Sequence, residues 1–538
     1  MLEKKLKKND ELEVVIERIG SNGEGIAVVD GIVIFVPFAL VGERVLIHII
    51  NDKNSFLIAK VVKVLTPSKQ RVVAPCPHFA KCGGCDIQHM CQSEQLKTKK
   101  LMVENALEKF AKINVKTNEV VASNKQFRYR NKFAFPVQDV NGEIKIGMFQ
   151  KNSHRIIEVE DCLLQSENAK LIVKLFKEFM IENKISAYNE QTKKGDVKHI
   201  VVREHGDEFI LTVVVTNKKF NKFEPLILKL KQQFNSFGIV KNVNNLNNNV
   251  IFGNFDEKIY GIQELGFEEF GISYTVNNRS FLQVNDYIKN LIYKKIIETL
   301  GDQTNVIDAY SGAGLLSSII AKNTQNVWGV EIVKEATENA NNLKLKNNLY
   351  NLTNKNGDCS EVIPELAKQL QGDFAVVVDP PRKGLDKKVV ETFLHCEPSK
   401  IVYLSCDPAT LARDLGLLKE KYDVEFVQPY DMFPQTANVE TLVCLNLKNT
   451  HSKTNEEKLQ KEQEKKKKIL KNKKKSQKTR EKSRYFDFYD DVKHDSHRDV
   501  AWWKNKNKTE KIYGKINFNC GADILGQKCT RNWASKKV

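Results

Sequence analysis

Short apolar runs separated by glycines and charged turns dominate the first 65 residues of the chain. Runs rich in Val and Ile occupy residues 13–17, 25–29, 31–36, 44–49 and 59–64. Five short strands in so few residues are typical of a small β-barrel of the oligonucleotide-binding kind, although such a barrel can also serve only as a scaffold. We therefore predict a barrel domain over residues 1–70.

The pattern of apolar positions changes twice further along the chain. Residues 92–112 predict a helix, and mixed elements follow to about residue 285, which indicates a central α+β domain over residues 71–285. From residue 286 on, helical segments alternate with apolar strands at residues 306–308, 327–330, 374–378 and 401–404. This alternation is typical of a parallel, doubly wound sheet. The expected fold is therefore multidomain, with a C-terminal α/β Rossmann-like domain over residues 286–450.

Charge is concentrated at the end of the chain. The 538 residues carry a net charge of +18, of which +14 lies in residues 451–538 and only +4 in residues 1–450. This Lys-rich tail has no hydrophobic periodicity, so we expect it to be disordered and to aid solubility or contact phosphates without sequence preference. No apolar stretch approaches the roughly 18 residues of a membrane span, and no secretory signal opens the chain. We expect a cytoplasmic protein without a membrane partner.

Four cysteines cluster after the barrel. Cys76, Cys82, Cys85 and Cys91 lie within sixteen residues, with two glycines between the second and third. Thiolates at this spacing on a flexible turn can converge on a zinc ion or an iron–sulfur cluster, and spacing alone does not distinguish them. Spacing nominates Cys91 as the fourth ligand. Unliganded cysteines are the alternative.

A glycine-rich turn indicates a nucleotide-like ligand in the C-terminal domain. Gly312 and Gly314 follow the strand at residues 306–308 and precede a helical segment. Glu331 ends the next strand, where a carboxylate can accept hydrogen bonds from both hydroxyls of a ribose. The third position of a dinucleotide motif is Ser317 here, so S-adenosylmethionine is favoured. Asp379 and the two prolines after it form a stiff wall at the same edge of the sheet.

Two further residues suit catalysis. Cys406 follows the strand at residues 401–404, and Asp407-Pro408 is typical of the start of a helix, whose N-terminus favours a thiolate. A buried, inert cysteine is the alternative. Alternation along the strand that begins near Val439 places Glu440 on an apolar face. Burial there raises the pKa of a carboxylate, which suits a proton-transfer catalyst.

These motifs together resemble one family. The set comprises Cys76-x5-Cys82-Gly83-Gly84-Cys85, Phe281-Leu282-Gln283-Val284-Asn285, Asp308-x3-Gly312-x-Gly314, Asp379-Pro380-Pro381-Arg382, Ser405-Cys406-Asp407-Pro408, and Phe433-Pro434-Gln435-Thr436 before Val439-Glu440. It resembles the RNA uracil-C5 methyltransferases, within them the RlmD/RumA group that acts on 23S ribosomal RNA. The likeness covers residues 10–448. Asn438 stands where the family usually has His, and Ser311 where Cys is common.

The resemblance implies a TRAM-type barrel, a central domain with a [4Fe-4S] cluster and a methyltransferase domain. It implies Cys162, in place of Cys91, as the ligand that joins Cys76, Cys82 and Cys85. It also implies that Gln283, Tyr310, Glu331 and Asp379 line the S-adenosylmethionine site, that Cys406 is the nucleophile and that Glu440 is the base.

The implied reaction follows from the low nucleophilicity of uracil C5. Addition of a Cys406 thiolate to C6 makes C5 enolate-like, so C5 can take the methyl group before Glu440 removes its proton. The target base must leave its stack to reach such a site. Residues 127–132, which include Arg128 and Tyr129, offer cationic and aromatic groups for RNA, or form a packed strand.

Several alternatives stay open. We expect a monomer acting on ribosomal RNA, but the same chemistry on transfer RNA or on two ribosomal sites has the same motifs. A cytosine-C5 enzyme is a further possibility. The alternative of another class is a non-catalytic RNA-binding assembly factor, against which the intact Cys406 and Glu440 argue.

Overall fold

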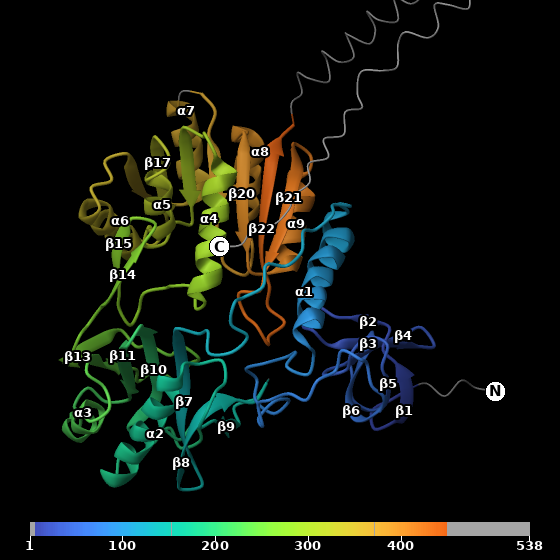
Figure 1. Cartoon of the computed structure of the whole chain (residues 1–538), viewed down its shortest axis with the longest axis vertical. Coiled ribbons are helices and arrows are strands. Elements are labelled where there is room, and N and C mark those ends of the chain that lie inside the picture. The colour runs from blue at the N-terminus through green and yellow to red at the C-terminus, as the bar shows by residue number, and fades with distance from the viewer. Residues whose placement is uncertain (1–5, 152, 371, 449–538) are drawn as a thin grey trace, which may run out of the picture. The chain divides into compact units, whose positions relative to one another are not determined.

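The computed structural model describes residues 6–151, 153–370 and 372–448, which belong to one compact unit, Met1–Lys448. The Lys-rich tail predicted for residues 451–538 lies outside the described residues. Within those that are described, no helix is both long and apolar enough to cross a membrane. Figure 1 shows the elements in chain order by colour.

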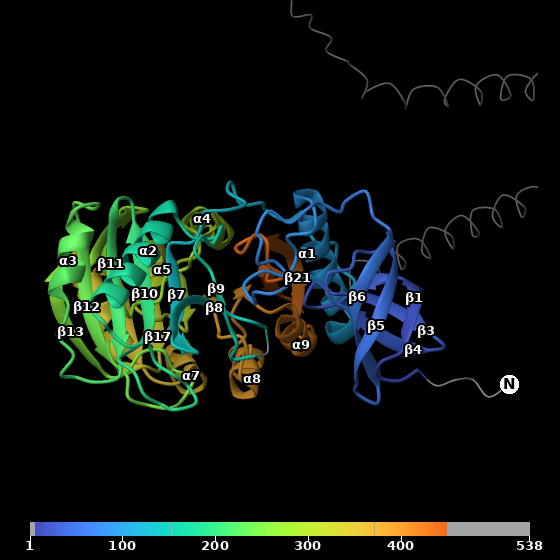
Figure 2. The same cartoon turned by 90° about the horizontal axis from the view of Figure 1, so that it is seen from below.

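The predicted barrel forms a six-stranded sheet in the order β1-β5-β6-β4-β3-β2. Figure 2 shows its strands β1, β3, β4, β5 and β6. Residues 16 and 17, which connect β1 to β2, close the sheet into a barrel. Ile16 N donates to Glu43 O, next to β5, at 2.9 Å, and Glu17 N donates to Ile26 O of β3 at 2.9 Å. Alternate Val and Ile side chains fill its interior. The five apolar runs are thus confirmed as strands. The strands are β1 (Glu11–Val15), β2 (Arg18–Ile19), β3 (Gly25–Val29), β4 (Ile32–Val36), β5 (Arg44–Asp52) and β6 (Phe56–Thr66).

The central segment forms a seven-stranded sheet in the order β13-β12-β11-β10-β7-β8-β9. Helices α2 and α3 cover one face and bury a core rich in Phe, Val and Ile. On α2, the side chain of Ser166 accepts the Ala169 amide and so caps the helix. The elements are β7 (Lys132–Val140), β8 (Glu143–Phe149), β9 (Ile156–Glu158), α2 (Glu167–Glu182), β10 (Val197–His205), β11 (Glu208–Val215), α3 (Glu224–Lys231), β12 (Phe237–Val243), β13 (Phe255–Gly261), and the hairpin β14 (Leu265–Glu269) and β15 (Ile272–Val276).

The C-terminal segment is the doubly wound sheet that the alternation predicts. Its order is β18-β17-β16-β19-β20-β22-β21, parallel except for β22, which runs antiparallel to both neighbours. The strands alternate side chains between two cores, one shared with α7, α8 and α9 and the other with α4 and α5. The elements are α4 (Asp286–Leu300), β16 (Asn305–Ala309), α5 (Leu315–Ala321), β17 (Asn326–Glu331), α6 (Lys334–Lys346), β18 (Leu352–Asn356), α7 (Cys359–Gln369), β19 (Ala375–Val378), α8 (Lys387–Cys396), β20 (Lys400–Ser405), α9 (Pro408–Leu418), β21 (Tyr422–Tyr430) and β22 (Glu440–Leu447).

The helix predicted over residues 92–112 forms α1 (Gln92–Ala106) and a π-helical turn, Leu107–Ala111. It lies within the predicted central domain in sequence, yet it packs on the C-terminal sheet. Val103 and Ala106 belong to the same core as Leu411 and Leu415 of α9. Chain order alone therefore does not assign this helix, and the boundaries at residues 70 and 285 stay predictions.

Candidate active site and cysteine cavity

Five of the predicted site residues meet at one edge of the C-terminal sheet. Tyr310, Asp379 and Cys406 each follow a parallel strand, Glu331 ends one, and Glu440 begins the antiparallel strand β22. The strand ends are in register through the pairs Ala309–Val330, Ala309–Val378, Val378–Tyr403 and Ser405–Thr441. Carboxyl ends of parallel strands are where ligands bind in such sheets, so this edge is the candidate active site.

The glycine-rich turn is held by Glu331. Gly312 N donates to Oε2 of Glu331 at 3.0 Å, and Val333 N donates to Oε1 at 2.8 Å. Gly314 has a φ of +79° and precedes α5, and a Cβ there would come within 2.7 Å of the Ala340 Cβ. The turn therefore requires glycine at this position. Glu331 is half-buried, and a carboxylate oxygen that accepts one hydrogen bond can accept a second, as a ribose-binding carboxylate needs.

Two neighbouring carboxyl groups have raised pKa values. Asp308 is 2% exposed, and Ser317 Oγ donates to its Oδ2 at 2.5 Å. Burial, with a smaller contribution from Asp379, raises the pKa of Asp308 to about 7. Burial also raises the pKa of Asp379 to about 7. A neutral carboxyl group can donate a hydrogen bond, so near neutral pH this edge of the sheet can both donate to and accept from a bound ligand.

Helix α9 begins as predicted, but its effect on Cys406 is not the predicted one. Asp407 caps the helix by accepting the amides of Ala409 at 3.0 Å and Thr410 at 2.9 Å, with Pro408 at the first helical position. The carboxylate thus takes up the amides that would favour a thiolate. Burial, followed by the charges of Glu440 and Asp379, raises the pKa of Cys406 to about 11. The net shift is therefore opposite to the effect expected of the helix N-terminus.

The prediction for Glu440 is confirmed in its direction. Its side chain is 3% exposed, and burial, followed by the charge of Asp379, raises its pKa to about 8, while Arg382 opposes the shift. Arg382 also opposes the shift of Cys406. The same charges thus act on the thiol and on the buried carboxyl. We refer to Cys406, Glu440, Asp379 and Arg382 as the charge cluster.

Sequence reasoning did not assign Arg382 to the site. Arg382 directly follows Asp379 and two prolines. The stiff backbone of the two prolines keeps the guanidinium near the sheet edge, and this could have indicated from the sequence that Arg382 belongs to the site. Its Nη2 also donates to Asn438 Oδ1 at 3.5 Å. A single cation among the carboxyl groups and the thiol can stabilise a negative charge that develops there.

The segment that contains Gln283 forms hydrogen bonds with Asn131, next to the central sheet, and with Met432, in the loop before Glu440. Gln283 O accepts a hydrogen bond from Asn131 Nδ2 at 3.1 Å. Asn285 caps α4 through Ile288 N, and its Nδ2 donates to Met432 O at 3.2 Å. These bonds place the segment between the central sheet and the loop that precedes Glu440. A role for the Gln283 side chain in the cofactor site stays a prediction.

A cavity of about 310 Å³ in the central segment is lined by Cys76, Cys82, Cys85 and Cys162. Burial raises the pKa of Cys85 to about 12, and the charge of Cys162 adds to the shift, so these thiols lie close together. Cys91 lies elsewhere, because its Sγ donates to Gln70 Oε1 at 2.8 Å. Among the residues that the structure describes, no group of three or more His, Cys, Asp or Glu side chains is arranged to hold a metal ion.

The cationic and aromatic residues considered for RNA contact are used inside the protein. Arg128 donates to both oxygens of Asp161, at 2.7 and 2.9 Å, and to Cys162 O at 3.0 Å. Tyr129 is buried, and its hydroxyl donates to Pro434 O at 3.1 Å. Both side chains are thus engaged within the protein, but neither residue lies in a strand, because β7 begins only at Lys132.

Comparisons with known proteins agree with this arrangement. Residues 91–448 match the family model described as tRNA (Uracil-5-)-methyltransferase, and residues 5–62 match the TRAM domain. An uncharacterized RNA methyltransferase of Listeria monocytogenes is 38% identical over 448 residues, which cover 82% of this chain and 99% of that protein. One from Clostridium tetani is 38% identical over 447 residues, which cover 82% of this chain and 97% of that protein.

One solved structure is similar over most of the described residues. The crystal structure of Pyrococcus abyssi tRNA (uracil-54, C5)-methyltransferase in complex with S-adenosyl-L-homocysteine has a TM-score of 0.66 and 27% sequence identity. The likeness covers 80% of this chain and 99% of that one.

Proposed function

Because the chain belongs to the RNA uracil-5-methyltransferase family, with a TRAM domain and S-adenosylmethionine as methyl donor, we propose that it methylates C5 of a uracil in 23S ribosomal RNA through a covalent Cys406 adduct. The observation that carries the proposal is the charge cluster. A thiol and a buried carboxyl lie at the ligand-binding edge of the sheet, where the charge of Glu440 raises the pKa of Cys406 and the charges of Asp379 and Arg382 act on both groups.

The chemistry assigns one task to each group. The Cys406 thiolate adds to C6 of uracil, and the electron pair of the C5–C6 bond moves onto C5 and O4. S-adenosylmethionine, when bound, would supply the electrophilic methyl group that C5 takes and would leave as S-adenosylhomocysteine. The Glu440 carboxylate then removes the C5 proton, the C5–C6 double bond re-forms and Cys406 leaves as a thiolate. Arg382 stabilises the negative charge that these steps carry through the site.

The cofactor would lie along the carboxyl ends of β16, β17 and β19. We propose that Glu331 holds the ribose hydroxyls and that Tyr310 and Gln283 contact the remainder of the cofactor. Asp379 would accept or donate a hydrogen bond at the amino acid end, since its pKa of about 7 allows both forms near neutral pH. Gly314 supports this placement. Its close approach to Ala340 leaves no room for a side chain there, so the cofactor can lie against the backbone of the turn.

The RNA class is tested by product mapping. Wild-type protein is incubated with labelled S-adenosylmethionine and unmodified transcripts of 23S ribosomal RNA and of transfer RNA, and the labelled nucleotide is located by mass spectrometry. We expect 5-methyluridine in 23S ribosomal RNA. The Pyrococcus relative makes transfer RNA the second candidate, and label in transfer RNA alone contradicts the ribosomal assignment. Labelled cytosine, or no label in either RNA, contradicts the proposed reaction and favours a cytosine enzyme or a non-catalytic factor respectively.

We further propose that the cysteine cavity holds a [4Fe-4S] cluster bound by Cys76, Cys82, Cys85 and Cys162. The cavity suits an anionic, sulfur-rich group in two ways. Arg130 faces the thiols, its charge lowers the pKa of Cys85 and Cys162 against the effect of burial, and its Nε is buried without a partner. Gln88 Nε2 and Gly84 N donate to the sulfurs of Cys85 and Cys82, as donors around such clusters do.

A pair of cysteine variants tests the ligand set. Cys162→Ala is expected to lose most of its iron, because three thiolates leave one iron without its protein ligand, whereas Cys91→Ala is expected to retain wild-type iron. Iron, sulfide and the broad visible absorbance are measured on anaerobically purified protein. Zinc in place of iron in the wild type, or equal iron in both variants, contradicts the assignment.

A further inference from the structure

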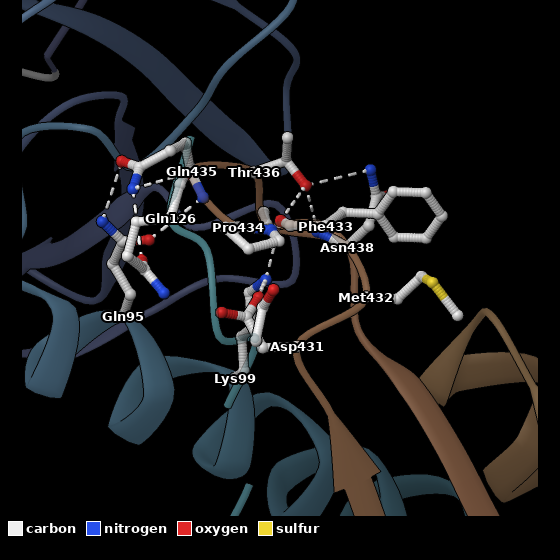
Figure 3. A network of polar contacts seen from close by, with 12 residues as sticks. Gln95, Lys99, Gln126, Asp431, Met432, Phe433, Pro434, Gln435, Thr436 and Asn438 are labelled. Carbon is white, nitrogen blue, oxygen red and sulfur yellow. Dashed lines mark hydrogen bonds and ion pairs between the residues drawn. The ribbon is translucent and has the colours of Figure 1, made fainter. Parts of the chain in front are cut away.

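The loop between β21 and β22, residues 431–439, leads directly to Glu440. Figure 3 shows that polar side chains from other segments surround this loop. Its central residue, Gln435, is 4% exposed and has a φ of +71°. A left-handed conformation is unfavourable for a side chain of this kind, so surrounding contacts must hold it in place.

Every polar group of Gln435 is paired. Its carbonyl oxygen accepts the amides of Asp86 at 3.1 Å and Ile87 at 3.2 Å. Its side-chain amide donates to Gln126 Oε1 at 3.3 Å. Its backbone amide and its side-chain oxygen are both paired with one residue, Gln95 of α1.

Both polar atoms of the Gln95 side chain, Oε1 and Nε2, form hydrogen bonds with Gln435. Its Oε1 accepts Gln435 N at 3.1 Å, and its Nε2 donates to Gln435 Oε1 at 3.0 Å and to Met90 O at 3.0 Å. One turn further along α1, Lys99 forms a fully buried ion pair with Asp431 at 2.5 Å and donates to Phe433 O at 2.9 Å. We refer to Gln95 and Lys99 as the α1 clamp.

The α1 clamp consists of polar side chains, although apolar side chains could have packed α1 against the loop equally well. Buried polar groups are costly unless they are paired, and a buried ion pair is often no more stabilising than an apolar replacement. Buried, paired polar groups do, however, hold the backbone in one conformation, because their hydrogen bonds are directional. The geometry fixed here is that of the chain that enters β22 at Glu440, where Tyr430 and Glu440 face each other across the two strands.

We propose that Gln95 is a positioning residue for methyl transfer, which sets the location of the Glu440 carboxylate by holding Gln435. This inference rests on the proposed function, in which Glu440 removes the C5 proton. Neither Gln95 nor Lys99 is among the groups that shift the pKa of Cys406 or Glu440. The clamp therefore acts through the backbone of the loop and not through its charge.

The proposal predicts a specific defect. A displaced Glu440 slows proton removal but leaves addition of Cys406 and methylation of C5 intact, so a methylated protein–RNA adduct accumulates on ordinary uridine substrate. Misplacement of a catalytic group by a remote change costs roughly 10- to 100-fold in rate. We expect Gln95→Met, which keeps the side-chain volume, to lower kcat by about this factor and to leave kcat/KM for RNA and S-adenosylmethionine within about twofold, because methyl transfer commits both substrates before proton removal.

The test uses full-length protein, labelled S-adenosylmethionine and the unmodified transcript that the wild type methylates. Turnover is measured together with the fraction of protein that carries denaturation-resistant labelled RNA. Lys97→Met is the matched control, because Lys97 lies on the same helix with its side chain 66% exposed. Should Gln95→Met not purify as folded protein, Gln95→Asn, whose shorter amide cannot keep both bonds to Gln435, is measured by the same criteria.

The outcomes distinguish failure of the positioning role of Gln95 from failure of the proposed function. An adduct with Gln95→Met and with Glu440→Gln, but not with Lys97→Met, supports the positioning role. An adduct with Glu440→Gln alone overturns it and leaves the proposed function standing. A Gln95→Met protein that loses activity through a raised KM, without an adduct, also overturns it. If Glu440→Gln forms no adduct and turns over normally, the proposed function itself fails.

Discussion

Replacement of Cys406 by alanine is expected to lower the rate of RNA methylation by roughly 10⁴-fold or more, because uracil C5 is too poor a nucleophile without addition at C6. Binding of S-adenosylmethionine should change little, since the residues proposed to hold the cofactor lie at the ends of β16, β17 and β19 or in the segment before α4, and not on β20. Methyl transfer is measured under single-turnover conditions, and cofactor binding is measured separately by calorimetry.

The control for this variant is Cys396→Ala. Cys396 ends α8, is only partly buried and lies outside the charge cluster. We expect it to retain wild-type activity. A Cys406→Ala protein that still methylates RNA at a comparable rate would show that the reaction proceeds without the thiol.

Replacement of Glu440 by glutamine is expected to slow turnover by roughly 10²- to 10⁴-fold, the usual contribution of a positioned general base. The amide keeps the size of the side chain but cannot accept the C5 proton, so the methylated adduct should persist through denaturing electrophoresis. Glu425→Gln is the control, because Glu425 lies on the neighbouring strand β21 and contacts Cys444 and Asn446. Rapid turnover without an adduct in Glu440→Gln would assign proton removal to another group.

The rate should also rise with pH in the wild-type protein. Glu440 acts as a base only when ionised, and its pKa of about 8 means that most molecules hold it protonated at pH 6 to 7. The Cys406 thiol, with a pKa of about 11, is likewise less reactive at low pH. We therefore expect kcat, which includes proton removal by Glu440, to increase by roughly tenfold per pH unit between pH 6 and 7 and to level off above about pH 8, where Glu440 is ionised. A rate that falls over this range contradicts the assigned ionisation.

The architecture was largely predictable from residue periodicity. Short Val and Ile runs between glycines produce the barrel, and the alternation after residue 286 produces the doubly wound sheet. The edge that gathers Tyr310, Glu331, Asp379 and Cys406 was also predictable, because parallel strands place their carboxyl ends together. Glu440 joins them for another reason. It begins the antiparallel strand next to β20, so its first residue lies at the same edge.

The parts that escaped sequence reasoning depend on long-range packing. Spacing favoured Cys91, which lies near the other cysteines in the chain but faces Gln70, whereas Cys162 reaches the cavity from a distant segment. Only the resemblance to a family indicated it. The pKa of Cys406 depends on Glu440 and Asp379, which no local pattern places beside it. Gln95 and Lys99 did carry a signal, since they lie four residues apart on the face of α1 that also buries Met102 and Val103.

The covalent step is tested most directly with RNA in which the target uridine is replaced by 5-fluorouridine. Fluorine at C5 cannot leave as a cation, so the reaction should stop after methylation with the pyrimidine bonded to the enzyme. We predict a denaturation-resistant complex whose tryptic peptide carries the modified nucleotide on Cys406. Full turnover of the fluorinated substrate, or a nucleotide attached to a different residue, would contradict the account.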